Sequence, residues 1–302
     1  MQDQAYLGNE EAQREDRDAL LMITERCNSD CVMCPMGPGA RLRGEALSDE
    51  TLDGLLEGIP DDVQHIDITG GEPFLRWRQV LHAMETINVR WPDADVLVLT
   101  NGRALSIDFL QREILPLLTP QYRFAIPIHA DTAGRHDGIT RAPGSFEQSM
   151  RALRFLSGTP AQIEVRLVAH KGNMDVLART CGMLCESGVR IDVFNLVAME
   201  MNGSAARNRD ALWVDYDRLY AAAEPGLLAL IAHGIDVGLY DFPLCAVPRR
   251  AWALAKRSIT PWKVRYAQAC GDCAVRQACG GLFRSTYLLG ICPVHPLSKE
   301  DA

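Results

Sequence analysis

The chain has 302 residues, of which 47% are hydrophobic and 23% are charged. This length and composition allow a full hydrophobic core, and they exclude a disordered, collagen-like or small disulfide-bonded protein. The net charge of −8 disfavours nucleic-acid binding. No apolar run reaches the roughly 18 residues of a membrane span, and no signal peptide is visible among the acidic first 18 residues. We therefore expect a cytoplasmic protein that binds neither nucleic acid nor a membrane.

Short apolar segments recur along the first two thirds of the chain. Each is too short for a helix and apolar enough for a strand covered on both faces. Stretches with helical periodicity separate them, and one of these, 145–157, begins with a Ser-Phe-Glu-Gln capping box. The alternation predicts a parallel α/β fold, a partial (β/α)6 TIM-type barrel with its active site at the carboxyl ends of the strands. The predicted strands are 20–24, 65–69, 96–100, 124–128, 163–168 and 191–197.

The pattern changes after about residue 205. A helix near 215–233 and a short strand at 235–240 precede a tail rich in cysteine and proline, which is typical of a small domain held by ligands. We predict an acidic N-terminal tail at 1–17, the partial barrel at 18–205, and a linker helix with a cysteine-rich domain at 206–302.

Ten cysteines are the unusual feature of the composition. Without an export signal they stay reduced, so they are available as metal ligands. Cys27, Cys31 and Cys34 follow the first predicted strand on one loop. Three thiolates from one loop suit a [4Fe–4S] cluster with one iron left open, whereas zinc prefers four ligands in pairs. The loop therefore predicts an iron–sulfur site.

Two turn motifs follow the next two predicted strands. The sequence Gly-Gly-Glu-Pro at 70–73 ends the second strand, and Thr-Asn-Gly at 100–102 ends the third. Two glycines allow a close approach of backbone to a ligand. Each motif alone also fits an ordinary tight turn. Because the carboxyl ends of parallel strands meet at one edge, the three motifs together indicate one site.

The C-x3-C-x2-C loop, GGEP and TNG as a set resemble the radical SAM superfamily, over roughly residues 18–205. The resemblance implies that Cys27, Cys31 and Cys34 hold a [4Fe–4S] cluster and that an external donor reduces it. It further implies reductive cleavage of S-adenosylmethionine (SAM) to a 5′-deoxyadenosyl radical, which abstracts hydrogen from a substrate. The catalytic residues that act on the substrate stay unknown. The implied SAM-binding residues are Gly70, Gly71, Glu72, Pro73, Thr100, Asn101 and Arg166.

The sequence allows more than one role for several other residues near this site. The resemblance puts Arg166 against the SAM carboxylate, although pairing with Glu164 is an alternative. Met33 stands where the family commonly has an aromatic residue, so we expect a different packing of the adenine. His129 and Asp131 follow the fourth predicted strand, where they either contact SAM or substrate or cap a turn.

A second cysteine group lies near the C-terminus. Its C-x2-C-x5-C-G-G pattern at 270–281 resembles the SPASM/twitch extension of radical SAM enzymes, which implies one auxiliary [4Fe–4S] cluster. We favour Cys245 over Cys292 as the fourth ligand, and a structural zinc is the alternative. The predicted ligands are Cys245, Cys270, Cys273 and Cys279. The basic, tryptophan-containing stretch 243–271 is either a docking face for an acidic peptide or substrate, or a solvated surface.

A closer likeness covers most of the chain. The block from Ser-Ile-Thr-Pro-Trp-Lys at 258–263 to Cys-Gly-Gly at 279–281 resembles the His-Xaa-Ser system radical SAM maturases. That resemblance implies a ribosomally synthesised peptide as substrate and a second radical SAM protein as partner. The alternatives are a twitch-type enzyme acting on a sugar or nucleoside, and a non-catalytic iron–sulfur or zinc scaffold.

Overall fold

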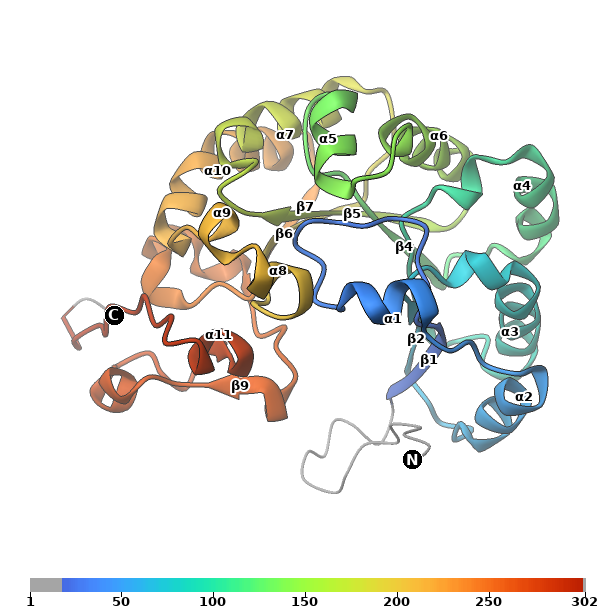
Figure 1. Cartoon of the computed structure of the whole chain (residues 1–302), viewed down its shortest axis with the longest axis horizontal. Helices are drawn as coiled ribbons and strands as arrows, with labels where there is room; N and C mark the ends of the chain where they lie inside the picture. The colour runs from blue at the N-terminus through green and yellow to red at the C-terminus, as the bar shows by residue number, and fades with distance from the viewer. Residues whose placement is uncertain (1–17, 301–302) are drawn as a thin grey trace. The chain divides into compact units, whose positions relative to one another are not determined.

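A computed structural model describes residues 18–300, so the predicted acidic tail at 1–17 lies outside the described residues (Figure 1). The chain divides into two compact units. Of the described residues, the first contains 18–30, 38–127 and 144–164. The second contains 31–37, 128–143 and 165–300. None of the described helices is both long and apolar enough to cross a membrane.

An open sheet of eight strands in chain order forms the framework, and it confirms the predicted partial-barrel fold class. The strands pair in parallel wherever their register is given; for example, Ile66 lies opposite Val96, and Val96 opposite Tyr122. Each of the six predicted strands overlaps an observed one. The strands are β1 (Asp18–Thr24), β2 (His65–Gly70), β3 (Asp95–Leu99), β4 (Tyr122–Pro127), β5 (Gln162–Ala169), β6 (Val193–Ala198), β7 (Asp236–Tyr240) and β8 (Ala255–Lys256).

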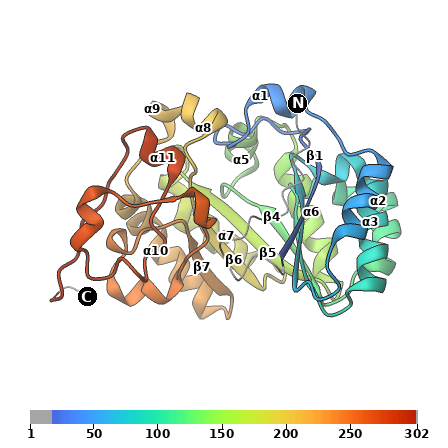
Figure 2. The same cartoon turned by 90° about the horizontal axis from the view of Figure 1, so that it is seen from below.

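Helices α2 (Asp49–Gly58), α3 (Trp77–Arg90) and α4 (Asp108–Ile114) lie on the same side of β1–β4 (Figures 1 and 2). α2 begins after Ser48, whose Oγ accepts a hydrogen bond from the N–H of Thr51. α3 buries apolar residues at helical spacing, and in β2 and β3 buried residues alternate with more exposed ones. The buried apolar residues of α3 are Val80, Leu81, Ala83, Met84 and Ile87.

The predicted capping box does not start α6 (Ser145–Ser157) as expected. Gly144 is the residue before the helix, with a φ of 80°, and Ser145 is already helical and almost completely buried. Glycine adopts this left-handed conformation without strain, so the turn at Gly144 sets where the helix begins. The remaining element of this unit is α1 (Pro38–Arg43).

In the second unit, α7 (Leu177–Glu186) packs against α10 (Tyr216–Ala232), which matches the helix expected near 215–233. The contact is close because Gly226 has no side chain: a Cβ there would lie 2.7 Å from the Cβ of Cys181. β7 and β8 extend the sheet beyond the six predicted strands. The other elements are α5 (Ala133–Thr140), α8 (Gly203–Arg207), α9 (Arg209–Leu212), the antiparallel pair β9 (Val264–Arg265) and β10 (Leu282–Phe283), and α11 (Arg284–Leu288).

Candidate functional site

The loop after β1 begins with Cys27, whose side chain is half-buried. Its backbone N–H donates to the carbonyl oxygen of Arg41 at 3.2 Å, and its Sγ accepts from the N–H of Ser29 at 3.4 Å. Arg41, which is 4% exposed, donates to the carbonyl oxygen of Ser29 at 3.2 Å and forms an ion pair with Asp30. The first turn of the cysteine loop is therefore fastened to α1.

The carboxyl end of β3 holds the same loop from another direction. The Nδ2 of Asn101 donates to the Oδ1 of Asn28 at 2.7 Å and lies 3.9 Å from the Sγ of Cys27. Arg103 donates to the carbonyl oxygen of Asn28 and to the Oγ of Ser29. Arg103 was not predicted from the sequence as a site residue. Its position immediately after Thr-Asn-Gly was the signal that could have indicated it.

The Glu72 carboxylate is completely buried within the first unit. Its Oε1 accepts from the N–H of Phe74 at 3.0 Å and the Oγ1 of Thr100 at 2.7 Å, and its Oε2 accepts from the N–H of Asn101 at 2.7 Å. Burial raises the pKa of Glu72, while these hydrogen bonds act in the opposite direction. The side chain thus ties the end of β2 to the end of β3.

Gly70 and Gly71 allow the backbone after β2 to pack directly on the backbone at the end of β1. A Cβ on Gly70 would overlap the carbonyl oxygen of Thr24, and one on Gly71 would overlap that of Glu25. The N–H of Gly71 donates to the carbonyl oxygen of Thr24 at 2.7 Å. The sequence reasoning attributed these glycines to the close approach of a ligand, whereas the observed close approach is to the end of β1. Pro73 follows, buried, at the start of a 3-10 turn (Pro73–Arg76).

Cys31 and Cys34 belong to the second unit, where backbone hydrogen bonds hold them. The N–H of Cys34 donates to the carbonyl oxygen of Cys31 at 3.2 Å. The carbonyl oxygen of Cys34 accepts from the N–H of Ser204 at 2.9 Å. Met33, between them, is 5% exposed. Met33 therefore anchors the loop by its thioether side chain. It joins an apolar cluster with Ala130, Ile139, Val176, Met199, Met201, Ala205, Leu212 and Ile291.

Arg166 and Asp241 lie in a charged cluster of the second unit. The Arg166 guanidinium is 5.5 Å from the centre of the Tyr240 ring. The buried Asp241 carboxylate accepts from the Oγ of Ser258 at 2.6 Å. Burial raises the pKa of Asp241 to about 6, and the Ser258 hydrogen bond and nearby Arg166 oppose that rise.

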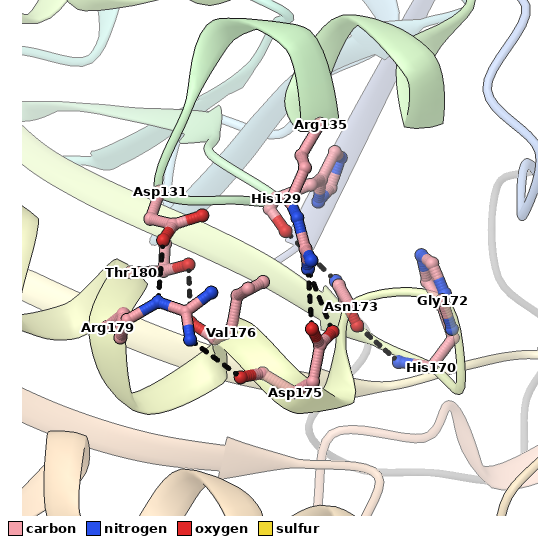
Figure 3. Close-up of polar contacts among 10 residues, drawn as sticks. All are labelled: His129, Asp131, Arg135, His170, Gly172, Asn173, Asp175, Val176, Arg179 and Thr180. Atoms are coloured by element: carbon pink, nitrogen blue, oxygen red, sulfur yellow. Dashed lines mark hydrogen bonds and ion pairs between the residues drawn. The ribbon is translucent and has the colours of Figure 1, made fainter.

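His129 and Asp131 make contacts that stabilise the fold (Figure 3). Asp131 accepts from the Nε of Arg179 at 2.9 Å, and the Nδ2 of Asn173 donates to the carbonyl oxygen of His129 at 3.1 Å. His129 is 3% exposed, and its backbone N–H donates to the Nδ1 of His136. Burial lowers the pKa of His129 well below its usual value, so the ring is neutral at pH 7.

Four cysteines of the C-terminal region line one pocket. They are Cys245, Cys270, Cys273 and Cys279, whereas the exposed Cys292 is not among the lining residues. Backbone N–H groups donate to three of the four sulfurs at 3.4–3.5 Å. Such bonds are typical of thiolates that hold iron–sulfur clusters, because they stabilise negative charge on sulfur. The donors are Leu244 and Gly281 to Cys279, His295 to Cys245, and Leu297 to Cys273.

Aromatic and basic side chains complete the lining of this pocket. The Oη of Tyr266 donates to the carbonyl oxygen of Cys279 at 2.8 Å, and the Arg276 guanidinium lies 5.1 Å from the Tyr266 ring centre. Burial raises the pKa of Cys245 and of Cys270, so binding a metal here must release their protons. Over residues 18–300, no group of three or more Cys, His, Asp or Glu side chains is arranged to hold a metal ion.

Residues 21–184, more than half of the chain, match the model of the radical SAM superfamily. The chain belongs to this superfamily. Members of this superfamily use a [4Fe–4S] cluster and SAM.

Two relatives resemble this radical SAM superfamily member in sequence. An uncharacterized protein of Archaeoglobus fulgidus is 24% identical over 263 residues, covering 81% of this chain and 61% of the relative. The AdoMet-dependent heme synthase of Nitratidesulfovibrio vulgaris is 24% identical over 156 residues, covering 50% of this chain and 40% of the synthase. The chain thus spans less than two thirds of either relative.

Solved structures share the fold of this radical SAM superfamily member at low sequence identity. Streptococcus suis SuiB bound to its precursor peptide SuiA has a TM-score of 0.58 at 11% identity, covering 81% of this chain and 52% of SuiB. The enzyme anSMEcpe with bound AdoMet and the Kp18Cys peptide has a TM-score of 0.53 at 12% identity, covering 74% of this chain and 63% of its own. At these identities the likeness shows the fold alone.

Proposed function

We propose that Cys27, Cys31 and Cys34 hold the [4Fe–4S] cluster of a SAM-cleaving radical enzyme. The observation that carries this proposal is the C-x3-C-x2-C loop at the end of β1, in a chain that matches the family over residues 21–184. The loop suits the cluster because none of the ten cysteines forms a disulfide and Cys27 already accepts an N–H hydrogen bond. When bound, the cluster supplies the electron that cleaves SAM.

We propose that SAM is bound by two segments at the ends of β2 and β3 and by the side chain of Arg166. Gly70, Gly71, Glu72 and Pro73 receive the methionyl amino end, and because the Glu72 side chain is buried, the backbone of this turn offers the acceptors. Thr100 and Asn101 carry the second segment, which also positions Cys27. Arg166 provides a charge-assisted partner for the SAM carboxylate. These residues bind and orient the cosubstrate and restrict the access of water to it.

We propose that the second cysteine group holds an auxiliary [4Fe–4S] cluster through Cys245, Cys270, Cys273 and Cys279. Their shared pocket and the N–H bonds to sulfur support this ligand set over one that contains Cys292. A single structural zinc held by the same four thiolates is the alternative, and the iron count distinguishes the two. On the proposed view the radical SAM site of the partial barrel lies within 18–205 and the auxiliary cluster within 206–302, whose β7 and β8 continue the sheet.

The proposed substrate is a ribosomally synthesised peptide that the enzyme modifies with a partner radical SAM protein and an external electron donor. Support comes from the likeness of the 258–281 block to His-Xaa-Ser maturases. It also comes from the fold shared with SuiB, which was solved with a precursor peptide, and with anSMEcpe, which was solved with a peptide.

The test is an anaerobic reconstitution followed by iron and sulfide counts, SAM cleavage and peptide modification. We expect about eight irons per chain and release of 5′-deoxyadenosine, with release lost in Cys27→Ala. Cys245→Ala is expected to halve the iron content, whereas the matched Cys292→Ala keeps it. Four irons with intact SAM cleavage would refute the auxiliary cluster. Turnover of a sugar or nucleoside, with no peptide modified, would refute the peptide proposal.

A further inference from the structure

Charge is distributed very unevenly along this acidic chain. Residues 242–300 contain nine lysines and arginines against two acids, Asp272 and Glu300, and so carry a net +7. The whole chain has 31 basic and 39 acidic residues, so the remainder has 22 and 37, a net −15. Charges more than about 10 Å apart are screened at physiological salt. The C-terminal region therefore attracts an acidic partner, whereas the net charge of the remainder repels it.

Three cations of this region lie beside the cysteine pocket, and we call Lys256, Arg257 and Arg276 the basic rim. All three are exposed. A Cβ on Gly280 would lie 3.5 Å from the carbonyl oxygen of Lys256 and 3.6 Å from the Cα of Arg257, so β8 runs against the Cys279 loop. Arg276 itself lines the pocket.

The rim cations have no acidic partner among residues 18–300. Other basic residues of the same region do: Arg250 pairs with Glu224 at 2.6 Å, and Lys263 lies 3.5 Å from Glu200. Cations that pair within the chain stabilise its fold, whereas unpaired cations in one place attract a partner of opposite charge.

We propose that the basic rim docks an acidic one-electron carrier protein that exchanges electrons with the auxiliary cluster. The inference rests on the proposed auxiliary cluster. Cys270 and Cys273 are only half-buried, so a carrier on the rim comes close to the cluster ligands. The step transfers one electron between the cluster and the carrier's redox group. It forms and breaks no bond, and each partner gains or loses that one electron.

The test measures electron transfer between the reconstituted full-length enzyme and an acidic flavodoxin by stopped-flow and rapid-freeze spectroscopy. Measuring in the Cys27→Ala background as well isolates the auxiliary-cluster signal. We expect the double variant K256E/R257E to lower the second-order rate by about tenfold or more at low salt and to flatten its salt dependence. The matched double variant R112E/R154E, on α4 and α6, changes the charge equally and is expected to keep the rate. Photoreduction by uncharged 5-deazaflavin is expected to stay the same in all of them.

An unchanged flavodoxin rate in K256E/R257E with eight irons present would overturn the docking proposal and leave the auxiliary cluster intact. Equal losses in K256E/R257E and R112E/R154E would also overturn it, because the effect would then follow net charge. Normal electron transfer with weakened binding of an acidic peptide would assign the rim to the peptide instead. Four irons per chain would remove the auxiliary cluster and the inference together.

Discussion

At the scale of single residues, the Glu72 carboxylate determines how two strand ends meet. Three donors converge on it, from Phe74, Thr100 and Asn101, and no water reaches it. A carboxylate accepts at both oxygens, whereas an amide of the same shape replaces one acceptor oxygen with an NH2 group and leaves at least one of these donors without an acceptor. The side chain therefore matters to the site as a fastener of the two strand ends.

We predict that Glu72→Gln lowers the free energy of unfolding by about 1–3 kcal/mol, since one buried donor loses its acceptor. SAM cleavage is expected to fall as well, because Asn101 loses its backbone anchor near Cys27. Urea unfolding and 5′-deoxyadenosine release measure the two effects. Glu50→Gln, at an exposed position of α2, serves as the control. Equal stability of the Glu72 and Glu50 variants would contradict the fastener role.

Arg103 leads to a second prediction at this scale. Its guanidinium donates to the backbone of Asn28, to the Oγ of Ser29 and to the Oε1 of Gln148, so it braces the start of the cysteine loop. We expect Arg103→Gln to keep the fold but to lose iron several times faster to a chelator. The exposed Arg112→Gln variant should behave like the parent. Matching rates of iron loss in all three proteins would show that the brace has no effect on the cluster.

The cysteines and the two turn motifs could be predicted from sequence because their spacing is local. Arg41 and Arg103 could not, because both bind main-chain oxygens of a loop that the fold brings to them. Every residue has a backbone carbonyl oxygen, so the sequence does not indicate which of them accepts a hydrogen bond from a distant side chain. The packing of Gly70 on the end of β1 could not be predicted for the same reason, because the backbone that it approaches belongs to Thr24, 46 residues earlier.

At the scale of elements, the contact between α7 and α10 depends on one missing side chain. A Cβ at Gly226 would lie 2.7 Å from the Cβ of Cys181 and 2.8 Å from the Cα of Ala178. Gly182, also on α7, has nothing within 4 Å of the same position. Two glycines in neighbouring helices thus serve different purposes, and only the packed structure distinguishes them.

We therefore predict opposite outcomes for two identical substitutions. Gly226→Ala should cost about 1–3 kcal/mol through overpacking, whereas Gly182→Ala should stabilise by about 0.5–1 kcal/mol through helix propensity. Thermal and urea unfolding of the two variants decide this. A stabilised Gly226→Ala protein would mean that α7 and α10 are packed less tightly than described.

At the scale of the whole molecule, the alternation of short, mainly apolar segments with helical stretches was enough to predict an open parallel sheet. It was not enough to assign β8, which has two residues and no pattern of its own. β7 was expected as a strand but was assigned to the C-terminal domain, and the sheet incorporates it instead. Strand membership at an edge is set by hydrogen bonding between segments, and hydropathy does not report it.

Buried histidines give the molecule a predictable response to acid. Burial lowers the pKa of His136 and of His170 to about 4 from the usual 6.5. Between these values the unfolded chain binds protons that the folded chain does not. Their contribution to stability is therefore full above pH 6.5 and is lost as the pH falls toward 4. At pH 5, each of these two histidines lowers the free energy of unfolding by about 2 kcal/mol relative to its value above pH 6.5. Asp241, with its pKa raised to about 6, acts in the opposite direction and offsets part of the loss.

We predict that the free energy of unfolding falls between pH 7 and pH 5 and that His170→Asn reduces this slope. Asparagine retains an acceptor for the Gly172 N–H, which donates to the Nδ1 of His170 at 3.0 Å, but it does not titrate. Urea unfolding of parent and variant at both pH values isolates the histidine, because any acid loss of the clusters affects both proteins equally. The contrary result is a parent and a variant that differ in their free energy of unfolding by the same amount at pH 7 and at pH 5. That result would show that His170 has the same pKa in the folded and unfolded chains. In that case the pH dependence would have to come from His129, His136 or the carboxylates.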